Sequence, residues 1–121
     1  MKPKTPRFKE IRPRFRVLLN GEIALGPGTA ALLAQVAAAG SISRAAEELG
    51  MSYMRAWTII KTMNRCFKKP LVVPVRGGAK GGGAQLTAAG KKALALYELA
   101  QAESLRATAA TWEEVLKMLR D

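Results

Sequence analysis

Hydrophobic and polar positions near the start of the chain alternate with the period of a β-strand. In the stretch RFRVLLNGEIAL, the apolar residues Phe15, Val17 and Leu19 stand at every second position, so their side chains would share one face of a strand. An Asn-Gly dipeptide follows, which favours a two-residue type I′ turn because both turn positions need positive φ. The pattern predicts a small β-hairpin over residues 14–25.

The next segments show helical spacing. Leu32, Leu33 and Val36 would share one face of a helix over residues 28–39, and the glycine that follows is typical of a helix end. A second, shorter helix is expected over residues 42–49, because a serine at its start can accept hydrogen bonds from free backbone amides. A short break then leads into a third helical pattern.

This third helix is predicted over residues 52–67, with two distinct faces. Apolar residues at spacings of four, three and four mark the side that packs on the core: Ala56, Ile60, Met63 and Phe67. The opposite side carries Tyr53, Met54, Arg55, Trp57, Thr58 and Lys61.

Two extended segments flank a glycine-rich loop after the third helix. The β-branched stretch LVVPV comes first, then RGGAKGGGA with five glycines in nine positions, and a second extended piece ends at Leu86. This arrangement predicts a hairpin, or wing, over residues 71–86. The loop does not fit a phosphate-binding P-loop, because Lys80 is followed by Gly81 where that motif needs serine or threonine.

The segment from residue 87 to residue 120 is predicted to form one long helix. It has no proline, and no glycine after Gly90; a helix of about 30 residues would extend roughly 45 Å. One stripe occupies the a and d positions of a heptad repeat: Leu94, Tyr97, Gln101, Leu105, Thr108, Trp112, Val115 and Leu119. The stripe predicts packing against a second copy of the chain as a dimer; the alternative is a helical hairpin within one chain.

The charge of the chain is strongly positive and clustered. The 121 residues include 20 Lys and Arg against nine Asp and Glu, a formal net charge of +11. Residues 1–16 hold seven bases and one acid, and residues 52–85 hold seven bases and no acid. Such clustering indicates a polyanionic partner. Residues 1–13, with three prolines among the bases, are expected to form a flexible basic arm.

The residue types present remove several functional classes. The chain has no histidine and a single cysteine, Cys66, so most metal-ligand sets and nucleophile constellations are missing. We expect neither an enzyme nor a bound metal or cofactor. One cysteine excludes an internal disulfide and suits a reducing cytosol. The basic N-terminus lacks the apolar segment of a signal peptide, and no apolar run reaches the length of a membrane span, so a cytoplasmic protein without a membrane partner is expected.

The second and third predicted helices, with their short break, are typical of a helix-turn-helix unit that places its basic second helix in the major groove of double-stranded DNA. The alternative is an amphipathic helix with a solvated basic face. Trp57 could equally seal the packing between helices or contact DNA. The candidate DNA-binding residues are Arg44, Ser52, Tyr53, Met54, Arg55, Trp57, Thr58, Lys61, Arg76, Lys80 and Gly81.

Several stretches in one order, GSISRAAEELGMSYMRAWTIIKTMN, PLV, GGAKGGGAQLTAAG and KKALALYEL, closely resemble the N-terminal winged-helix domain of ModE-type molybdate-responsive transcription regulators, relatives of the LysR-type DNA-binding domain. The resemblance covers about residues 14–103. It implies a homodimer with a recognition helix over residues 52–67, a wing over residues 71–86 and a dimer contact after Thr87. Full-length family members carry C-terminal molybdate-binding domains; this chain ends at Asp121, so we expect no molybdate site on it.

The predicted fold is therefore mostly α with small β-hairpins: a winged helix-turn-helix over residues 14–86 and a long dimerisation helix over residues 87–120. The predicted function is that of a homodimeric, sequence-specific transcription regulator acting on an inverted-repeat operator. Two alternatives remain open. One is a non-specific nucleic-acid-binding or nucleoid-type protein, and the other is a DNA-binding module that recruits a separate sensor partner.

Overall fold

A computed structural model of the chain describes residues 8–76 and 83–121. Within these residues the fold is mostly helical with two small antiparallel hairpins, so the predicted fold class is confirmed. The elements in chain order are β1 (Val17–Leu19), β2 (Glu22–Leu25), α1 (Pro27–Ala39), α2 (Ile42–Glu48), α3 (Tyr53–Cys66), β3 (Val72–Val75), β4 (Gly83–Leu86) and α4 (Ala88–Met118).

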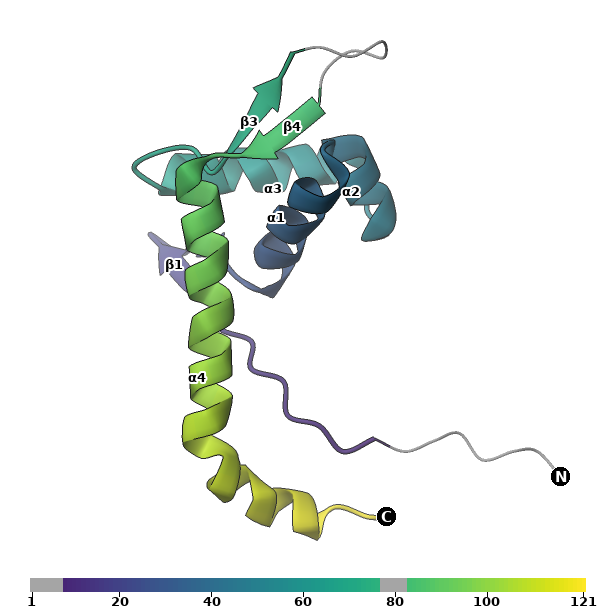
Figure 1. The fold of residues 1–121 in the computed structure, drawn as a ribbon, viewed down its shortest axis with the longest axis vertical. Coiled ribbons are helices and arrows are strands. Elements are labelled where there is room, and N and C mark those ends of the chain that lie inside the picture. Colours follow the sequence, from purple (N-terminus) through teal and green to yellow (C-terminus); the bar gives the residue numbers. More distant parts are fainter. Residues whose placement is uncertain (1–7, 77–82) are drawn as a thin grey trace, which may run out of the picture.

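The first three helices form the body of the molecule, and α4 extends away from it (Figure 1). The largest fully buried side chains come from α1, α3 and the segment that leads into β3: Leu32, Leu33, Val36, Ile60, Met63 and Leu71. Burying side chains of this size stabilises a fold by about 1.5–3 kcal/mol each. The apolar stripes seen in the sequence therefore meet in one core beneath the outward face of α3.

A glycine sets the turn between α2 and α3. Gly50 has a φ of 67°, in the left-handed region that favours glycine. Its N–H donates to the carbonyl of Glu47 at 3.1 Å, and the N–H of Met51 donates to the carbonyl of Ala46 at 3.0 Å. This pair of bonds is a Schellman motif, which ends α2 sharply and lets α3 begin three residues later.

The wing hairpin β3–β4 is anchored to the helices at its base. The N–H of Ala84 donates to the carbonyl of Gly40 at 3.0 Å, and the N–H of Thr87 donates to the carbonyl of Leu71 at 2.9 Å. A Cβ on Gly90 would overlap that same Leu71 carbonyl, so the first turn of α4 lies directly on the wing. The wing is thus held between the end of α1 and the start of α4.

Residues 8–16 form a segment without helix or strand that starts near the first half of α4 and leads away from it toward the N-terminus (Figure 1). The Tyr97 hydroxyl donates to the carbonyl of Phe15 at 2.8 Å, and Gln101 Nε2 donates to the carbonyl of Pro13 at 3.3 Å. Lys9 Nζ lies 3.3 Å from a carboxylate oxygen of Asp121. The part of the predicted flexible arm that the structure describes is therefore in contact with α4; residues 1–7 lie outside the described residues.

The heptad stripe of α4 is divided between two environments. Tyr97 is only 6% exposed, and Leu94 packs against the core, whereas Trp112, Val115 and Leu119 are between 41% and 47% exposed. Gln101, Leu105 and Thr108 are half-buried. A heptad pattern shows which residues share a face but not what covers it, and the chain itself covers most of the Tyr97 side chain. That the stripe faces a second copy of the chain stays a prediction.

Candidate nucleic-acid interface

The outward face of α3 is the best-formed candidate site on the described part of the chain. Met54, Arg55, Thr58 and Lys61 are exposed, while Ala56, Ile60 and Met63 on the other side are buried in the core. Ser52 caps the helix, since its hydroxyl oxygen accepts the N–H of Arg55 at 3.1 Å. The helix thus presents a basic face, and its first turn is fixed by the Ser52 cap.

The two aromatic residues at the start of α3 lie against each other. Their ring centroids are 6.2 Å apart with the planes at 87°, an edge-to-face pair. Tyr53 is 50% exposed, whereas Trp57 is half-buried and packs against the core. Of the two roles considered for Trp57, the structure therefore shows the packing role, and Tyr53 is the more accessible ring.

The hydroxyl groups on this face differ in what they can donate. Thr58 Oγ1 donates to the carbonyl of Met54 at 2.9 Å, so its proton is directed along the helix rather than outward. Ser52 uses its oxygen as an acceptor, which leaves its proton free to reach a phosphate oxygen. Ser52 is accordingly the better hydroxyl donor toward a ligand.

Other candidate residues lie on neighbouring elements. Arg44 is exposed on α2, where its N–H donates to the Ser41 hydroxyl at 3.0 Å, and Arg76 is exposed directly after β3. Lys80 and Gly81 lie outside the described residues. The structure therefore places α2, α3 and the base of the wing around one end of the molecule (Figure 1).

Within α3 the charged residues are all basic, whereas α2 carries the exposed Glu47 and Glu48. The one carboxylate that contacts α3 among the described residues belongs to Glu22 of β2, and Arg65 of α3 pairs with it at 3.1 and 3.3 Å. The outward face of α3 therefore has basic groups without competing acids.

Sequence analysis missed three residues that flank α3. Arg14, Arg16 and Thr62 line a cavity beside the helix together with Arg55. Thr62 could have been found from its helical spacing, because it stands four and seven residues after Thr58 and Arg55. Arg14 and Arg16 could not, because only the tertiary fold brings the segment before β1 to this flank.

Within residues 8–76 and 83–121, no group of three or more His, Cys, Asp or Glu side chains is placed to hold a metal ion. In the same residues, no helix combines the length and the apolar character that crossing a membrane requires.

The chain matches the model of the family described as bacterial regulatory helix-turn-helix protein, LysR family, over residues 29–91, the segment from α1 to the start of α4. It is 47% identical over 73 residues to the molybdenum-pterin-binding protein MopB of Rhodobacter capsulatus, covering 60% of this chain and 27% of that protein. It is 46% identical over 72 residues to the molybdenum transport protein ModE of Azotobacter vinelandii, with the same two coverages.

A third relative is the DNA-binding transcriptional dual regulator ModE of Escherichia coli K12, 40% identical over 81 residues that cover 67% of this chain and 31% of that protein. The chain thus spans less than a third of the length of these relatives. The resemblance to ModE-type regulators is confirmed by these matches. Because the matched segment is the one that folds into α1–α3 and the wing, the chain belongs to the LysR family of bacterial regulatory helix-turn-helix proteins.

Proposed function

We propose that this chain is a DNA-binding transcription regulator that acts as a homodimer on an inverted-repeat operator. The observation that carries the proposal is the outward face of α3, which is exposed, basic and free of unpaired acids, on a helix whose other side is fixed in the core. A relative named as a DNA-binding transcriptional regulator supports it.

The proposed mechanism assigns different tasks to different basic residues. A helix fits the major groove, which is about 12 Å wide, and α3 would enter it with Arg55 and Lys61 toward base edges. Arg44 and Arg76 would contact phosphates on either side, together with Lys80 of the wing. Base contacts would specify the sequence, and phosphate contacts would fix the register.

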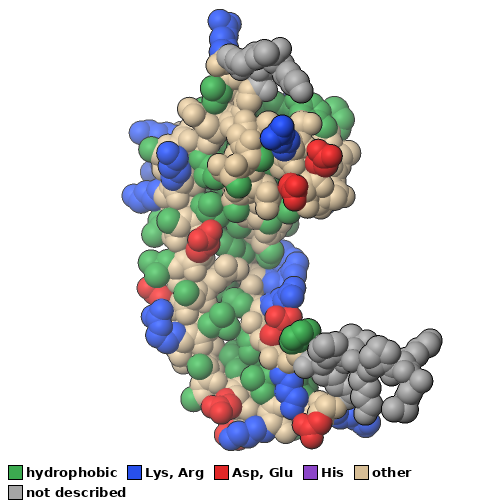
Figure 2. Space-filling model, turned by 45° about the vertical axis from the view of Figure 1, so that its right-hand side comes forward, with side chains coloured by type: hydrophobic (Ala, Val, Ile, Leu, Met, Phe, Trp, Pro, Cys, Tyr) green, Lys and Arg blue, Asp and Glu red, His purple; other side chains and the backbone are tan. Residues whose placement is uncertain are grey.

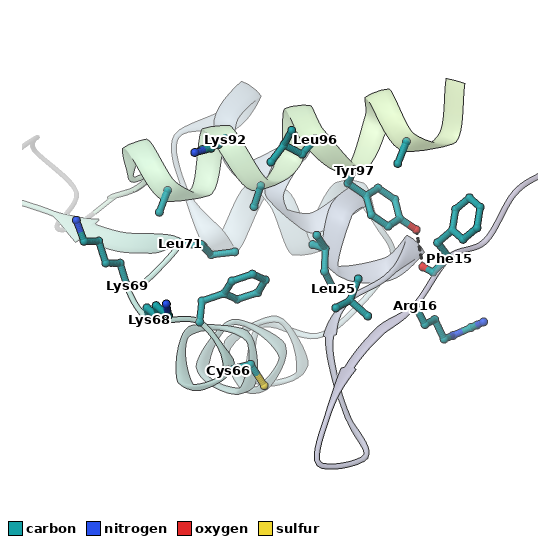
Figure 3. Close-up of a pocket in the computed structure, with 15 residues that line it drawn as sticks. Phe15, Arg16, Leu25, Cys66, Lys68, Lys69, Leu71, Lys92, Leu96 and Tyr97 are labelled. Carbon is teal, nitrogen blue, oxygen red and sulfur yellow. Dashed lines mark hydrogen bonds between the residues drawn. The ribbon is translucent and has the colours of Figure 1, made fainter. Parts of the chain in front are cut away.

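The homodimer is proposed from apolar surface on and beside α4. A groove of about 860 Å³ lies between β1, the end of α3 and the first half of α4; its wall includes Val17 and Leu96 (Figure 3). Leu96 and Leu99 are 54% and 50% exposed, although the heptad pattern did not include them. Green apolar side chains also run along the α4 column in Figure 2.

We therefore assign the dimer contact to this groove, which Tyr97 also lines, and to the exposed distal residues Trp112, Val115 and Leu119. Exposed apolar area of this kind, rimmed by charged residues, is typical of protein interfaces. A dimer would place two copies of α3 on one face of DNA, about 34 Å apart for half-sites one helical turn apart. The alternative, recruitment of a separate sensor subunit by the same surface, predicts a monomer in isolation.

Competition binding tests the proposal. The protein should stay bound to a labelled operator DNA when an equal mass of unlabelled random DNA is added. Its affinity for the operator should fall steeply as the salt concentration rises. If each dimer neutralises six phosphates, log K should change with log salt at a slope of about −5. Equal competition by random DNA would instead support the non-specific nucleic-acid-binding function that the net charge of +11 also favours.

A further inference from the structure

A second cavity lies beside α3, on the flank away from the wing. It has a volume of about 550 Å³ and is formed by the β1–β2 hairpin, the start of α1 and the side of α3. In Figure 1 and Figure 3 the hairpin and β3 lie on opposite sides of α3. The cavity therefore borders the proposed DNA-binding face on the side that the wing does not reach.

Three arginines line this cavity, Arg14, Arg16 and Arg55. They come from two parts of the chain, the segment before β1 and helix α3. None of their side chains makes a hydrogen bond or an ion pair with a residue in the described part of the chain. Figure 3 shows the Arg16 side chain pointing away from the apolar groove. Like charges gathered in this way repel one another unless an anion joins them.

One carboxylate also lines the cavity, and it is already neutralised. Glu22 accepts two hydrogen bonds from Arg65 Nη2, at 3.1 and 3.3 Å, and the Cys66 Sγ lies 4.0 Å from one of its oxygens. The Arg65 guanidinium thereby balances the negative charge of the Glu22 carboxylate. The cavity therefore keeps a positive charge from the three arginines.

The remaining walls suit a small anion with several oxygens. Thr62 contributes a hydroxyl group, and the start of α1 is open because its capping residue, Gly26, has no side chain to cover the first amides. A Cβ on Gly28 would meet nothing within 4 Å, so a ligand can approach the backbone there. The helix dipole adds a smaller attraction for an anion to that of the arginines.

We propose that this cavity binds one backbone phosphate of the DNA whose major groove α3 enters. The inference rests on the proposed function and extends it: α3 would be held by phosphate contacts on both flanks, from the wing on one side and from Arg14 and Arg16 on the other. Planar guanidinium groups match phosphate oxygens in paired hydrogen bonds. A phosphate here would neutralise the charges of Arg14 and Arg16, which no described protein group pairs.

The test replaces Arg14 and Arg16 by glutamine, which keeps the stem of Arg16 that packs beside Gly26. Each bound copy should lose one phosphate contact. The slope of log K against log salt should become shallower by about 0.9 per copy, and affinity should fall about fivefold per copy at about 150 mM salt. The matched control is Arg106→Gln with Arg120→Gln, which removes the same charge from exposed positions in and after α4 and should change neither quantity by as much.

A variant that is expected to raise DNA affinity gives an independent check. Glu22→Gln removes the one carboxylate of the cavity, so affinity should rise, whereas a merely structural role for Glu22 would lower it. Replacing single phosphates of the DNA by uncharged methylphosphonates should then identify one position per half-site at which the wild-type protein loses affinity and the Arg14→Gln, Arg16→Gln variant does not.

Two results would overturn the inference and leave the proposed function intact. One is a glutamine variant that binds operator DNA with wild-type affinity and salt slope. The other combines two observations: inorganic phosphate binds saturably at the cavity, as monitored by NMR of the Gly28 amide, and replacing the arginines leaves the DNA affinity unchanged. That result would assign the cavity to a free anion. Failure of the wild-type protein to prefer any DNA sequence would contradict the proposed function itself.

Discussion

Asn64 of α3 and Val72 of β3 are joined by hydrogen bonds in both directions. Asn64 Nδ2 donates to the Val72 carbonyl at 3.0 Å, and the Val72 N–H donates to Asn64 Oδ1 at 3.3 Å. The same oxygen accepts the N–H of Leu71 at 2.8 Å. One amide side chain therefore forms hydrogen bonds like those of a neighbouring strand and fixes the wing relative to α3.

Replacing Asn64 by alanine should destabilise the protein by about 2–3 kcal/mol, because two N–H donors and one carbonyl would lose their partner in a partly buried place. Asn64→Asp keeps the accepting oxygen but places a charged oxygen against the Val72 carbonyl, so it should also destabilise the protein. Urea denaturation followed by circular dichroism measures both. An alanine variant as stable as the wild type would show that the side chain does not hold the wing.

Tyr97 offers a prediction that depends on pH. Burial raises the pKa of its phenol, while the nearby Arg16 and Arg14 act in the lowering direction. The folded state therefore holds this proton more tightly than the unfolded state, whose phenol titrates near 10. The resulting stability is fully present below pH 10 and is lost as pH rises through the folded pKa.

Tyr97→Phe should lower the free energy of unfolding by about 0.5–1.5 kcal/mol at pH 8, since the hydrogen bond to the Phe15 carbonyl is lost. Its stability should then decline less than that of the wild type between pH 9 and pH 11. Thermal or urea unfolding across this range gives the comparison. Parallel pH profiles for the two proteins would mean that Tyr97 does not titrate as described.

The homodimer can be tested at the first half of α4. Leu96→Glu places a charge on an exposed apolar side chain of the groove, and a charge in a desolvated interface opposes association. The variant should become monomeric by light scattering at concentrations at which the wild type is a dimer. Ala109→Glu, at another exposed position of α4, serves as the control and should remain dimeric; a monomeric wild type would instead favour recruitment of a separate partner.

The division between base-reading and phosphate contacts predicts two kinds of binding defect. Arg55→Ala should lower affinity for the operator and relax the preference at one base position, a loss of about 1–3 kcal/mol. Arg76→Ala should weaken binding to all sequences by a similar factor, and Lys80→Ala is expected to do the same. Binding to a panel of single-base operator variants separates the effects; a uniform loss for Arg55→Ala would place that residue on a phosphate.

Local patterns predicted much of the fold because their causes are local. The Asn-Gly dipeptide of the first hairpin has the positive φ values that a type I′ turn needs, 49° at Asn20 and 81° at Gly21. The apolar spacing of Ala56, Ile60 and Met63 identified the buried side of α3. At the starts of α2, α3 and α4, the side chains of Ser41, Ser52 and Thr87 accept backbone N–H groups three residues ahead. Each of these features needs only neighbours within a few residues.

The rest depends on residues that are distant in sequence. Tyr97 matches a heptad position, yet its hydroxyl bonds to Phe15, 82 residues away, and no periodicity reports that contact. The cavity beside α3 combines Arg14 and Arg16 with Arg55, which only the packing of the hairpin brings together. Sequence therefore predicted the elements and the basic face of α3, but not which faces of α4 the chain itself covers.

The central claim is that α3 reads a specific DNA sequence in the context of a dimer. The most direct test is selection of bound sequences from a random DNA library by the purified protein at about 150 mM salt, where non-specific attraction is partly screened. The account predicts enrichment of an inverted repeat whose half-sites lie about one helical turn apart or a multiple of it. A library that returns without enrichment would contradict it and leave the positive charge as the sole basis of DNA binding.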